Sequence, residues 1–258
     1  MALEVYDGHT LTQIGHLHLY HRADLDAQAL LKAIHGGGEI LKTSSKSETR
    51  RVGEWVVKRS RPERGLGPLK RTLARNRYRR AWLAANYLHA RGVRVPAPLA
   101  YGEWTSFGII LDNAMATQFL AGHINVEIYA AQLVREATTE ESLDAFLAGL
   151  ASAVNRLADA GAYHADLSGK NIFTKDGKNF YFIDLDGVVL GESYGHALRL
   201  KNHIQLYDSF CDFCEHDTLV RFHSRMLPDS ENLDGWMRLV VEGQKARRRR
   251  HHRDRNSG

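Results

Sequence analysis

The chain has 258 residues, of which 43% are hydrophobic, and a formal net charge of +5 that leaves its 14 histidines uncounted. This length is enough for one large domain, or for two lobes that bury a real core. No stretch approaches the roughly 18 consecutive apolar residues of a transmembrane helix, so we expect no such helix.

The N-terminus and the cysteines show no sign of a secreted or zinc-binding protein. Met1–Asp7 has neither the basic region nor the apolar stretch of a secretory signal, so we expect a cytoplasmic protein. Cys211 and Cys214 form a lone Cys-x-x-Cys, which offers too few ligands for structural zinc. Two thiols on one face of a helix are the favoured interpretation, and a redox pair is the alternative.

Basic residues are concentrated in two places. No acidic residue occurs from Arg64 to Gly102, a stretch with nine arginines and lysines, and Lys245–Arg253 is a second basic run. This distribution favours an anionic partner, which could be nucleic acid, a phosphorylated glycolipid or an anionic membrane surface. The alternative is a solvated face and a disordered tail.

In chain order, the first elements predict a small β-rich lobe. A short strand at Leu17–Tyr20 precedes a helix with Asp24 as its N-cap. The glycines at 36–38 then break the chain, and three short strands with turns between them follow. These strands are Glu39–Thr43, Glu48–Val52 and Glu54–Lys58.

Lys58, at the end of the third of these strands, is predicted to hold the phosphates of a nucleotide. The hairpin tip at 42–47 contains no glycine, so it departs from the G-x-G-x-x-G pattern of a phosphate-covering loop. Ser44 and Ser45 can still offer backbone N–H groups there, and Lys46 adds positive charge. We therefore predict that nucleotide is bound by four residues, Lys58, Ser44, Ser45 and Lys46.

A basic helix over Leu69–Arg91 and a strand over Phe107–Leu111 come next. The segment Asp112–Met115 then has the position of the hinge in a two-lobed kinase, where backbone groups of Asp112 and Ala114 would hold adenine. This prediction rests on position alone.

The predicted basic helix contains no acidic residue, so the glutamate that should pair with Lys58 is missing. Three explanations stay open. Asp184 and the phosphates hold Lys58 directly, a distant acid substitutes for the glutamate, or the chemistry is impaired.

The second half of the sequence predicts a mainly helical lobe. Thr138–Glu141 is a capping box that opens a helix to about Ala160, with one continuous apolar face. Two strand-like runs follow, at Ile172–Thr174 and Phe180–Ile183. Three further helices are expected at Leu198–Phe213, Asp217–Met226 and Asn232–Gln244.

The feature that decides the function lies between these elements. In His164-Ala-Asp-Leu-Ser-Gly-Lys-Asn171 a carboxylate precedes an amide by five residues, and Asp184 follows Asp166 by 18 positions. Phosphoryl transfer needs a group that orients the attacking hydroxyl and ligands that hold Mg²⁺ on the phosphates. Asp166 suits the first role as catalytic base. Asn171 and Asp184 supply the oxygen ligands that Mg²⁺ prefers.

Neighbouring residues complete the predicted site. Lys170 either neutralises the migrating phosphoryl group, as a catalytic residue, or is an ordinary loop lysine. His164 is expected to anchor the loop backbone. Asp186 is either a second metal ligand or the cap of the turn at Gly187, and the turn is favoured. Ala165 stands where many protein kinases have an arginine that reads a phosphorylated activation loop, so such switching is not expected.

In these residues the chain resembles the lipopolysaccharide core kinases, the family of Kdo kinases and inner-core heptose kinases. The resemblance covers roughly residues 40–215. The matching stretches are Trp55–Lys58, Leu88–Pro96, His164–Leu167, Asn171–Ile172, Phe182–Asp186 and Asn202–Phe210. One departure is Ala81, where relatives tend to have the glutamate of an Arg-Glu-Trp.

The resemblance implies a two-lobed, α+β protein-kinase-like fold, with a β-rich N-lobe at 1–114, a mainly helical C-lobe at 115–245 and a basic, disordered tail at 246–258. It implies ATP and Mg²⁺ as cofactors, and transfer of the γ-phosphate to a heptose or Kdo hydroxyl of the lipopolysaccharide inner core. It also implies a peripheral location on the anionic inner face of the inner membrane, and no specific nucleic acid. The arginines expected to face the acceptor are Arg71, Arg75 and Arg79.

Other function classes stay open. RIO-type atypical kinases of ribosome maturation share the His-Ala-Asp-Leu-Ser loop, but Asp184–Gly187 and Asn202–Phe210 fit the glycolipid kinases better. Aminoglycoside-type phosphotransferases share the loop spacing but would favour an acidic cleft. A nucleotide-binding pseudokinase is suggested by the missing helix glutamate.

Overall fold

The computed structural model describes residues 6–45, 47–61, 76–136, 139–191, 195–228 and 232–256. The chain divides into two compact units. The N-terminal unit consists of Met1–Ala90, Val95–Ala121 and Leu185–Gly187, and the C-terminal unit of Arg91–Arg94, Gly122–Asp184 and Val188–Gly258. The main division thus falls after Ala121, and not after residue 114 as predicted, because a strand of the first unit continues beyond that position.

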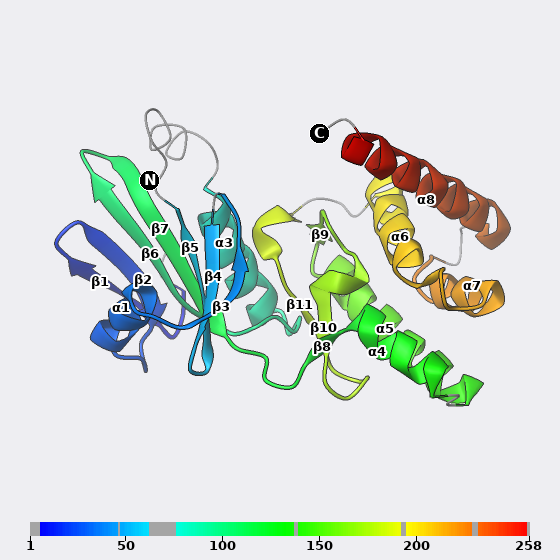
Figure 1. Cartoon of the computed structure of the whole chain (residues 1–258), viewed down its shortest axis with the longest axis horizontal. Coiled ribbons are helices and arrows are strands. Elements are labelled where there is room, and N and C mark those ends of the chain that lie inside the picture. Colours follow the sequence, from blue (N-terminus) through cyan, green and yellow to red (C-terminus); the bar gives the residue numbers. More distant parts are fainter. Residues whose placement is uncertain are drawn as a thin grey trace. The chain divides into compact units, whose positions relative to one another are not determined.

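The N-terminal unit is built on a seven-stranded antiparallel sheet in the order β1-β2-β6-β7-β5-β4-β3 (Figure 1). The strands are β1 His9–Ile14, β2 Leu17–Arg22, β3 Glu39–Thr43, β4 Ser47–Val52, β5 Trp55–Ser60, β6 Pro98–Ser106 and β7 Ile109–Gln118. Two helices accompany the sheet, α1 Ala27–His35 and α3 Arg77–Ala90. The predicted hairpin strands before Lys58 are therefore confirmed.

A hydrophobic core joins α1 to the sheet. Leu30 and Ile34 of α1 are buried against Leu17, Leu19 and Val57 of the strands. The apolar periodicity of the first helix is explained by this contact. Its N-cap lies two residues later than predicted.

Helix α1 begins after Asp26, whose side chain accepts a hydrogen bond from the backbone N–H of Gln28 at 3.0 Å. Asp24, the predicted cap, instead forms an ion pair with Arg22. Both aspartates have a cap-compatible side chain, and the neighbouring arginine decides between them.

The predicted hinge at Asp112–Met115 is wrong, because this segment lies inside strand β7. Ala114 is opposite Gly102 of β6 and Arg59 of β5, so the backbone has a paired strand on both sides. The Asp112 carboxylate accepts hydrogen bonds from Arg59, at 2.7 and 3.0 Å. Asp112 and Ala114 are therefore not placed on an open connection that could hold adenine.

The cause of this error is the hairpin turn between β6 and β7. Phe107 has a φ of 48° and Gly108 a φ of 76°, so the chain reverses within the apolar run that suggested one buried strand. Phe107 is fully exposed at the turn. An apolar run gives no sign of a reversal when an aromatic residue occupies the turn itself.

The C-terminal unit is mainly helical and contains two small sheets. Its sheets have the strand orders β11-β10-β8 and β12-β9. The strands are β8 Ile124–Asn125, β9 Ala162–His164, β10 Ile172–Thr174, β11 Phe180–Phe182 and β12 Val188–Leu190. The helices are α4 Val126–Arg135, α5 Glu140–Asp159, α6 His196–Phe210, α7 His216–Ser224 and α8 Leu233–Asn256, with the 3₁₀ turn η1 at Gly169–Asn171. A second 3₁₀ turn, η2 at Leu185–Gly187, belongs to the N-terminal unit.

The long helix before the catalytic motif is confirmed. In α5, Phe146, Leu147, Leu150, Val154 and Leu157 are buried, as the three-and-four spacing predicted. The N-cap is Thr139, which makes no capping hydrogen bond with its side chain. The predicted cap at 138 lies outside the described residues.

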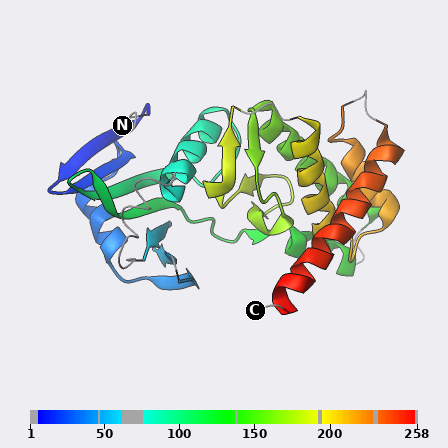
Figure 2. The same ribbon diagram turned by 90° about the horizontal axis from the view of Figure 1, so that it is seen from above.

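The basic C-terminal segment is helical and not disordered. Helix α8 runs to Asn256 and packs against α6 (Figure 2). Arg248 binds Asp208 of α6 and Asp212 of the turn that follows it, at 2.6 and 2.8 Å, and these contacts offset the repulsion within the run of arginines. None of the helices in the described ranges is both long and apolar enough to cross a membrane.

Candidate active site

The loop between β9 and η1 contains Asp166 and is tied down by a buried histidine. His164 is 1% exposed. The backbone N–H of Asp166 lies 3.2 Å from its Nδ1, and the carbonyl of Ile183 lies 2.9 Å from its Nε2. Because a backbone N–H only donates, Nδ1 accepts, and Nε2 donates to Ile183. His164 thus links the loop of Asp166 to the residue before Asp184, which agrees with its predicted anchoring role.

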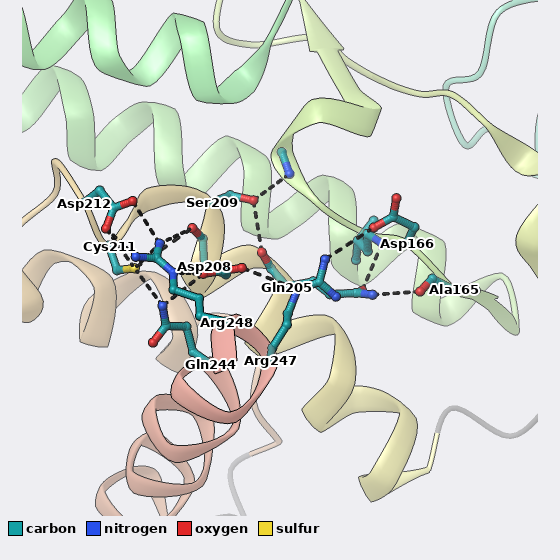
Figure 3. Close-up of polar contacts among 12 residues, drawn as sticks. Ala165, Asp166, Gln205, Asp208, Ser209, Cys211, Asp212, Gln244, Arg247 and Arg248 are labelled. Atoms are coloured by element: carbon teal, nitrogen blue, oxygen red, sulfur yellow. Dashed lines mark hydrogen bonds and ion pairs between the residues drawn. The ribbon is translucent and has the colours of Figure 1, made fainter. Parts of the chain in front are cut away.

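Helix α6 supplies the remaining partners of this loop. Asn202 donates to the carbonyl of His164 at 2.8 Å, and Gln205 donates to the carbonyl of Ala165 at 2.7 Å. The Gln205 Oε1 atom also accepts from the backbone N–H of Leu167 at 2.9 Å. Two amide side chains therefore satisfy polar backbone groups of the loop, and Figure 3 shows the one from Gln205 directed at Ala165.

Ser209, one turn further along α6, also binds the loop. Its Oγ accepts from the backbone N–H of Gly169 at 2.8 Å. A Cβ on Gly169 would lie 2.6 Å from Glu127 and 3.2 Å from Ser209, so only glycine fits at this approach. The stretch Asn202–Phe210 that resembled the Kdo kinases is therefore a brace for the catalytic loop.

The sequence prediction did not include Gln205. A signal was present, because positions 202, 205 and 209 repeat at three and four residues and so share one helix face. Polar residues on a face that otherwise packs inward indicate bonding to buried backbone.

Asn171 holds Asp166 directly. The Nδ2 atom of Asn171 donates to the carbonyl of Asp166 and to its carboxylate Oδ2, both at 2.9 Å. Because the amide nitrogen of Asn171 faces Asp166, its amide oxygen points away from Asp166. The Asp166 side chain is 59% exposed, which leaves it accessible to a substrate.

Asp184 lies two residues after the end of β11. The backbone N–H of Ile183 donates to the carbonyl of Asn171 at 2.9 Å, and β10 pairs with β11 just before it. Asp184 has a φ of 59°, a left-handed conformation that costs a non-glycine residue on the order of 1–3 kcal/mol. Non-glycine residues in this conformation concentrate at functional sites, where the surrounding structure holds them.

The donor chemistry of Asn171 and Asp184 fits Mg²⁺, which takes a few protein oxygens and completes its shell with water and phosphate. Among the residues that the structure describes, no group of three or more His, Cys, Asp or Glu side chains is arranged as a metal site. Asn171 and Asp184 offer one amide oxygen and one carboxylate. This donor set fits a metal ion that the phosphates of the nucleotide also help to hold.

The nucleotide-side residues lie in the N-terminal unit. Lys58 is in β5, opposite Thr49 of β4 and Met115 of β7. Ser44 begins the tight β3–β4 turn, where its backbone N–H donates to the carbonyl of Ser47 at 2.9 Å, and Ser45 is exposed at the turn. Position 46 is outside the described residues.

The described part of the helix after β5 has no acidic residue, and Ala81 is buried in it at 9% exposure. Arg71 and Arg75 are outside the described residues, so the predicted basic face cannot be traced along this helix. Asp186, in η2, lies 3.9 Å from Arg77 of α3. This contact favours a structural role for Asp186 over a role as metal ligand.

A cleft of about 700 Å³ opens beside Asp166 within the C-terminal unit. Lys170 lines it, so the structure brings both predicted catalytic residues to one cavity. The lining also contains charged and polar residues that the sequence prediction did not select. They are Glu127, Ser168, Gln205, Asp208, Ser209, Asp212, Phe213, Arg247, Arg248 and His252.

The two cysteines are free thiols that lie just after the C-terminal end of α6. Burial raises the pKa of Cys214 to about 11, and it also raises the pKa of Cys211. The thiolate is the reactive form, so a raised pKa opposes reactivity at neutral pH.

Comparison with protein-family models matches residues 43–224 to the lipopolysaccharide kinase (Kdo/WaaP) family. Among solved structures, WaaP in complex with acyl carrier protein matches with a TM-score of 0.63 and 20% identity, over 86% of this chain and 92% of that one. WbdD matches with a TM-score of 0.49 and 14% identity, over 79% of this chain and 45% of that one. A comparison with curated proteins found no match.

The similarity to WaaP extends over nearly the whole of both chains. Together with the antiparallel sheet at the N-terminus and the helices at the C-terminus, it confirms the predicted α+β, protein-kinase-like fold.

Proposed function

The chain belongs to the lipopolysaccharide kinase (Kdo/WaaP) family, and on that premise we propose how its residues divide the work. It is an ATP-dependent kinase that phosphorylates a sugar of the lipopolysaccharide inner core. The family match covers more than half of the chain and includes the catalytic motif. It decides against the RIO-type alternative.

Asp166 is the catalytic base in this proposal. The observation that supports it most is the pair of hydrogen bonds from Asn171, which orient a carboxylate that is still 59% exposed. The sugar hydroxyl donates its proton to Asp166 as its oxygen forms a bond to the γ-phosphorus and the bond to ADP breaks. The loop contacts of His164 and Gln205 keep the base in place.

Asn171 and Asp184 are the proposed ligands of Mg²⁺. When bound, the ion offsets the negative charge on the phosphate oxygens during transfer. The left-handed conformation of Asp184 and the amide orientation of Asn171 support this assignment. Lys170, exposed in the cleft beside Asp166, is proposed to neutralise the migrating phosphoryl group.

Lys58, Ser44 and Ser45 are proposed to bind the phosphates of ATP from the sheet of the N-terminal unit. The antiparallel pairing of β3, β4 and β5 supports this, because it reproduces the hairpin and lysine-bearing strand that kinases use for phosphates. Lys46 is proposed for the same role from its position in the sequence.

We also propose which sugar is phosphorylated and where in the cell the protein works. The acceptor sugar is a heptose or Kdo, and the protein works as a peripheral protein at the cytoplasmic face of the inner membrane. The net charge of +5 supports attraction to an anionic glycolipid surface.

A kinetic comparison of purified Asp166→Asn with wild type tests the assigned base. Loss of general-base catalysis should lower the rate of phosphate transfer to lipopolysaccharide by roughly 10²–10⁴. Nucleotide binding should be retained. Asp159→Asn, at the exposed end of α5, is the matched control and should transfer at the wild-type rate.

The same experiment separates an enzyme from a pseudokinase. Binding of ATP without transfer by the wild-type protein would indicate a pseudokinase. Equal transfer by wild type and Asp166→Asn would reject Asp166 as the base.

A further inference from the structure

Helix α8 brings two consecutive arginines to the cleft beside Asp166, from a part of the chain that lies beyond the family match at 43–224. The cleft is lined by Asp166 and Lys170, but by neither predicted metal ligand, Asn171 or Asp184. It therefore opens on the base side of the site, where the hydroxyl that attacks the phosphate must enter.

Arg248 is fully engaged by two carboxylates. Its guanidinium donates to Asp208 at 2.6 Å, and to the two carboxylate oxygens of Asp212 at 2.8 and 2.9 Å. These carboxylates raise the pKa of Arg248, and Arg248 lowers the pKa of Asp212. Arg248 thus fixes α8 against α6 and has little capacity for a ligand (Figure 3).

Arg247, one residue earlier, is held much more loosely. Its Nε lies 3.4 Å from Asp208 and its Nη2 lies 3.9 Å from Asp166. The Nε atom is buried, and within the described part of the chain it has no hydrogen-bond partner of good geometry. Gln244 and Arg248 both donate to Oδ1 of Asp208, whereas the Arg247 Nε atom lies near Oδ2 without the geometry of a hydrogen bond.

The position of Arg247 suits an anion next to the base. Figure 3 shows its guanidinium between Asp208 and Asp166. A guanidinium binds a carboxylate or a phosphate through two parallel N–H···O bonds, a geometry that the distant Asp166 contact does not provide. Lys170 lines the same cleft and adds a positive charge, while two of the four carboxylates in the lining, Asp208 and Asp212, are bound by Arg248.

We propose that Arg247 is an acceptor-binding residue, which holds a carboxylate or phosphate group of the acceptor glycolipid beside Asp166 and so presents the sugar hydroxyl to the base. This inference rests on the proposed function. It adds to that function a specificity determinant on α8 that recognises anionic acceptors.

The test measures the KM for lipopolysaccharide core and the binding of an ATP analogue for Arg247→Gln. Loss of a charge-assisted bidentate contact should raise the KM for the acceptor about 10- to 100-fold. The affinity for the ATP analogue should stay within about twofold. Arg247→Lys, which keeps the charge without the fork, should give an intermediate KM and also guards against misfolding of the glutamine variant.

Arg249→Gln is the matched control, because Arg249 is an exposed arginine on the same helix. Its acceptor KM should remain within about twofold of wild type, which separates a specific contact from the general attraction of a basic helix.

Two modified acceptors identify the anionic group. One is core oligosaccharide with its phosphates removed, and the other has its carboxyl groups reduced. The acceptor that lacks the recognised group should have a similar KM with wild type and Arg247→Gln, since the interaction is then absent in both.

An unchanged acceptor KM in both Arg247 variants would overturn the proposal. So would a faster reaction in Arg247→Gln, which would make the Asp166 contact an inhibitory one. Absence of transfer by the wild-type protein is a different result, and would reject the proposed function itself.

Discussion

At the scale of single residues, the site depends on a few hydrogen bonds whose donors and acceptors are unambiguous. Asn171 donates to Asp166 twice, and the Asp166 N–H donates to His164. The base is thus oriented from its own backbone and from a residue five positions later. The two functions assigned to Asn171, tether and metal ligand, use different atoms of one amide and can be separated by substitution.

We expect Asn171→Ala to raise the Mg²⁺ concentration for half-maximal activity about 10- to 100-fold, because it removes an oxygen ligand. Asn171→Asp keeps an oxygen but replaces the N–H donor with a negative charge beside Asp166. It should therefore lower kcat while the Mg²⁺ requirement changes little. Titration of activity with Mg²⁺ measures both, and an identical Mg²⁺ dependence of wild type and Asn171→Ala would argue against the ligand assignment.

At the scale of elements, α6 is the part of the C-terminal unit that organises the catalytic loop. Asn202, Gln205 and Ser209 face the loop, while Asp208 on a neighbouring face binds α8. One helix therefore connects the base to the basic helix that lines the cleft. Damage to this face should cost stability as well as activity.

Gln205→Ala should destabilise the protein by about 2 kcal/mol, because it leaves the N–H of Leu167 and the carbonyl of Ala165 without their buried partner. Chemical denaturation measures the change. Lys201→Ala, exposed on the same helix, is the control and should stay within about 0.5 kcal/mol of wild type. Equal stability of the two variants would contradict the bracing role.

A buried histidine pair between α6, α7 and α8 gives these helices a pH dependence. The Nδ1 of His203 is 2.9 Å from Trp236 Nε1 and 2.9 Å from His223 Nδ1. Trp236 only donates, so the Nδ1 atom of His203 accepts from it and carries no proton. Burial lowers the pKa of His203 to about 3, with Arg199 contributing, and burial lowers the pKa of His223 well below 6.5.

The direction of this effect follows from proton uptake. Below pH 6.5 the unfolded chain binds protons at both histidines and the folded protein does not, so the free energy of unfolding falls as the pH is lowered towards about 3. Two such groups give a slope of up to about 2.7 kcal/mol per pH unit. Denaturation at a series of pH values between 6.5 and 4 checks this. A flat profile for wild type would show that the pair can be protonated without loss of packing.

At the scale of the whole molecule, the sequence was sufficient where local pattern and structure agree. Local patterns predicted the strand of Lys58, which continues two residues further than expected, and the apolar helix face from Phe146 to Leu157. The Asp166 motif, also a local pattern, lies in the expected loop. The family match and the similarity to WaaP support the same fold class.

The sequence was insufficient where a contact distant in the chain decides the local structure. The hinge prediction failed because Phe107 occupies a turn, and only the pairing of β6 with β7 reveals this. The run of arginines from Arg247 has the composition of a solvated tail, and it is helical because Asp208 and Asp212 bind Arg248. Contacts of this kind join positions about 40 residues apart and leave no periodicity in either segment.

The most direct test of the central claim is the location of phosphate after reaction of the purified protein with ATP and lipopolysaccharide core. Mass spectrometry and phosphorus NMR of the released oligosaccharide would identify the product. The account predicts a new phosphomonoester on an inner-core sugar with the wild-type protein, reduced about 10²–10⁴ in rate with Asp166→Asn. A core that gains no phosphomonoester from the wild-type protein, or gains it equally from both proteins, would contradict it.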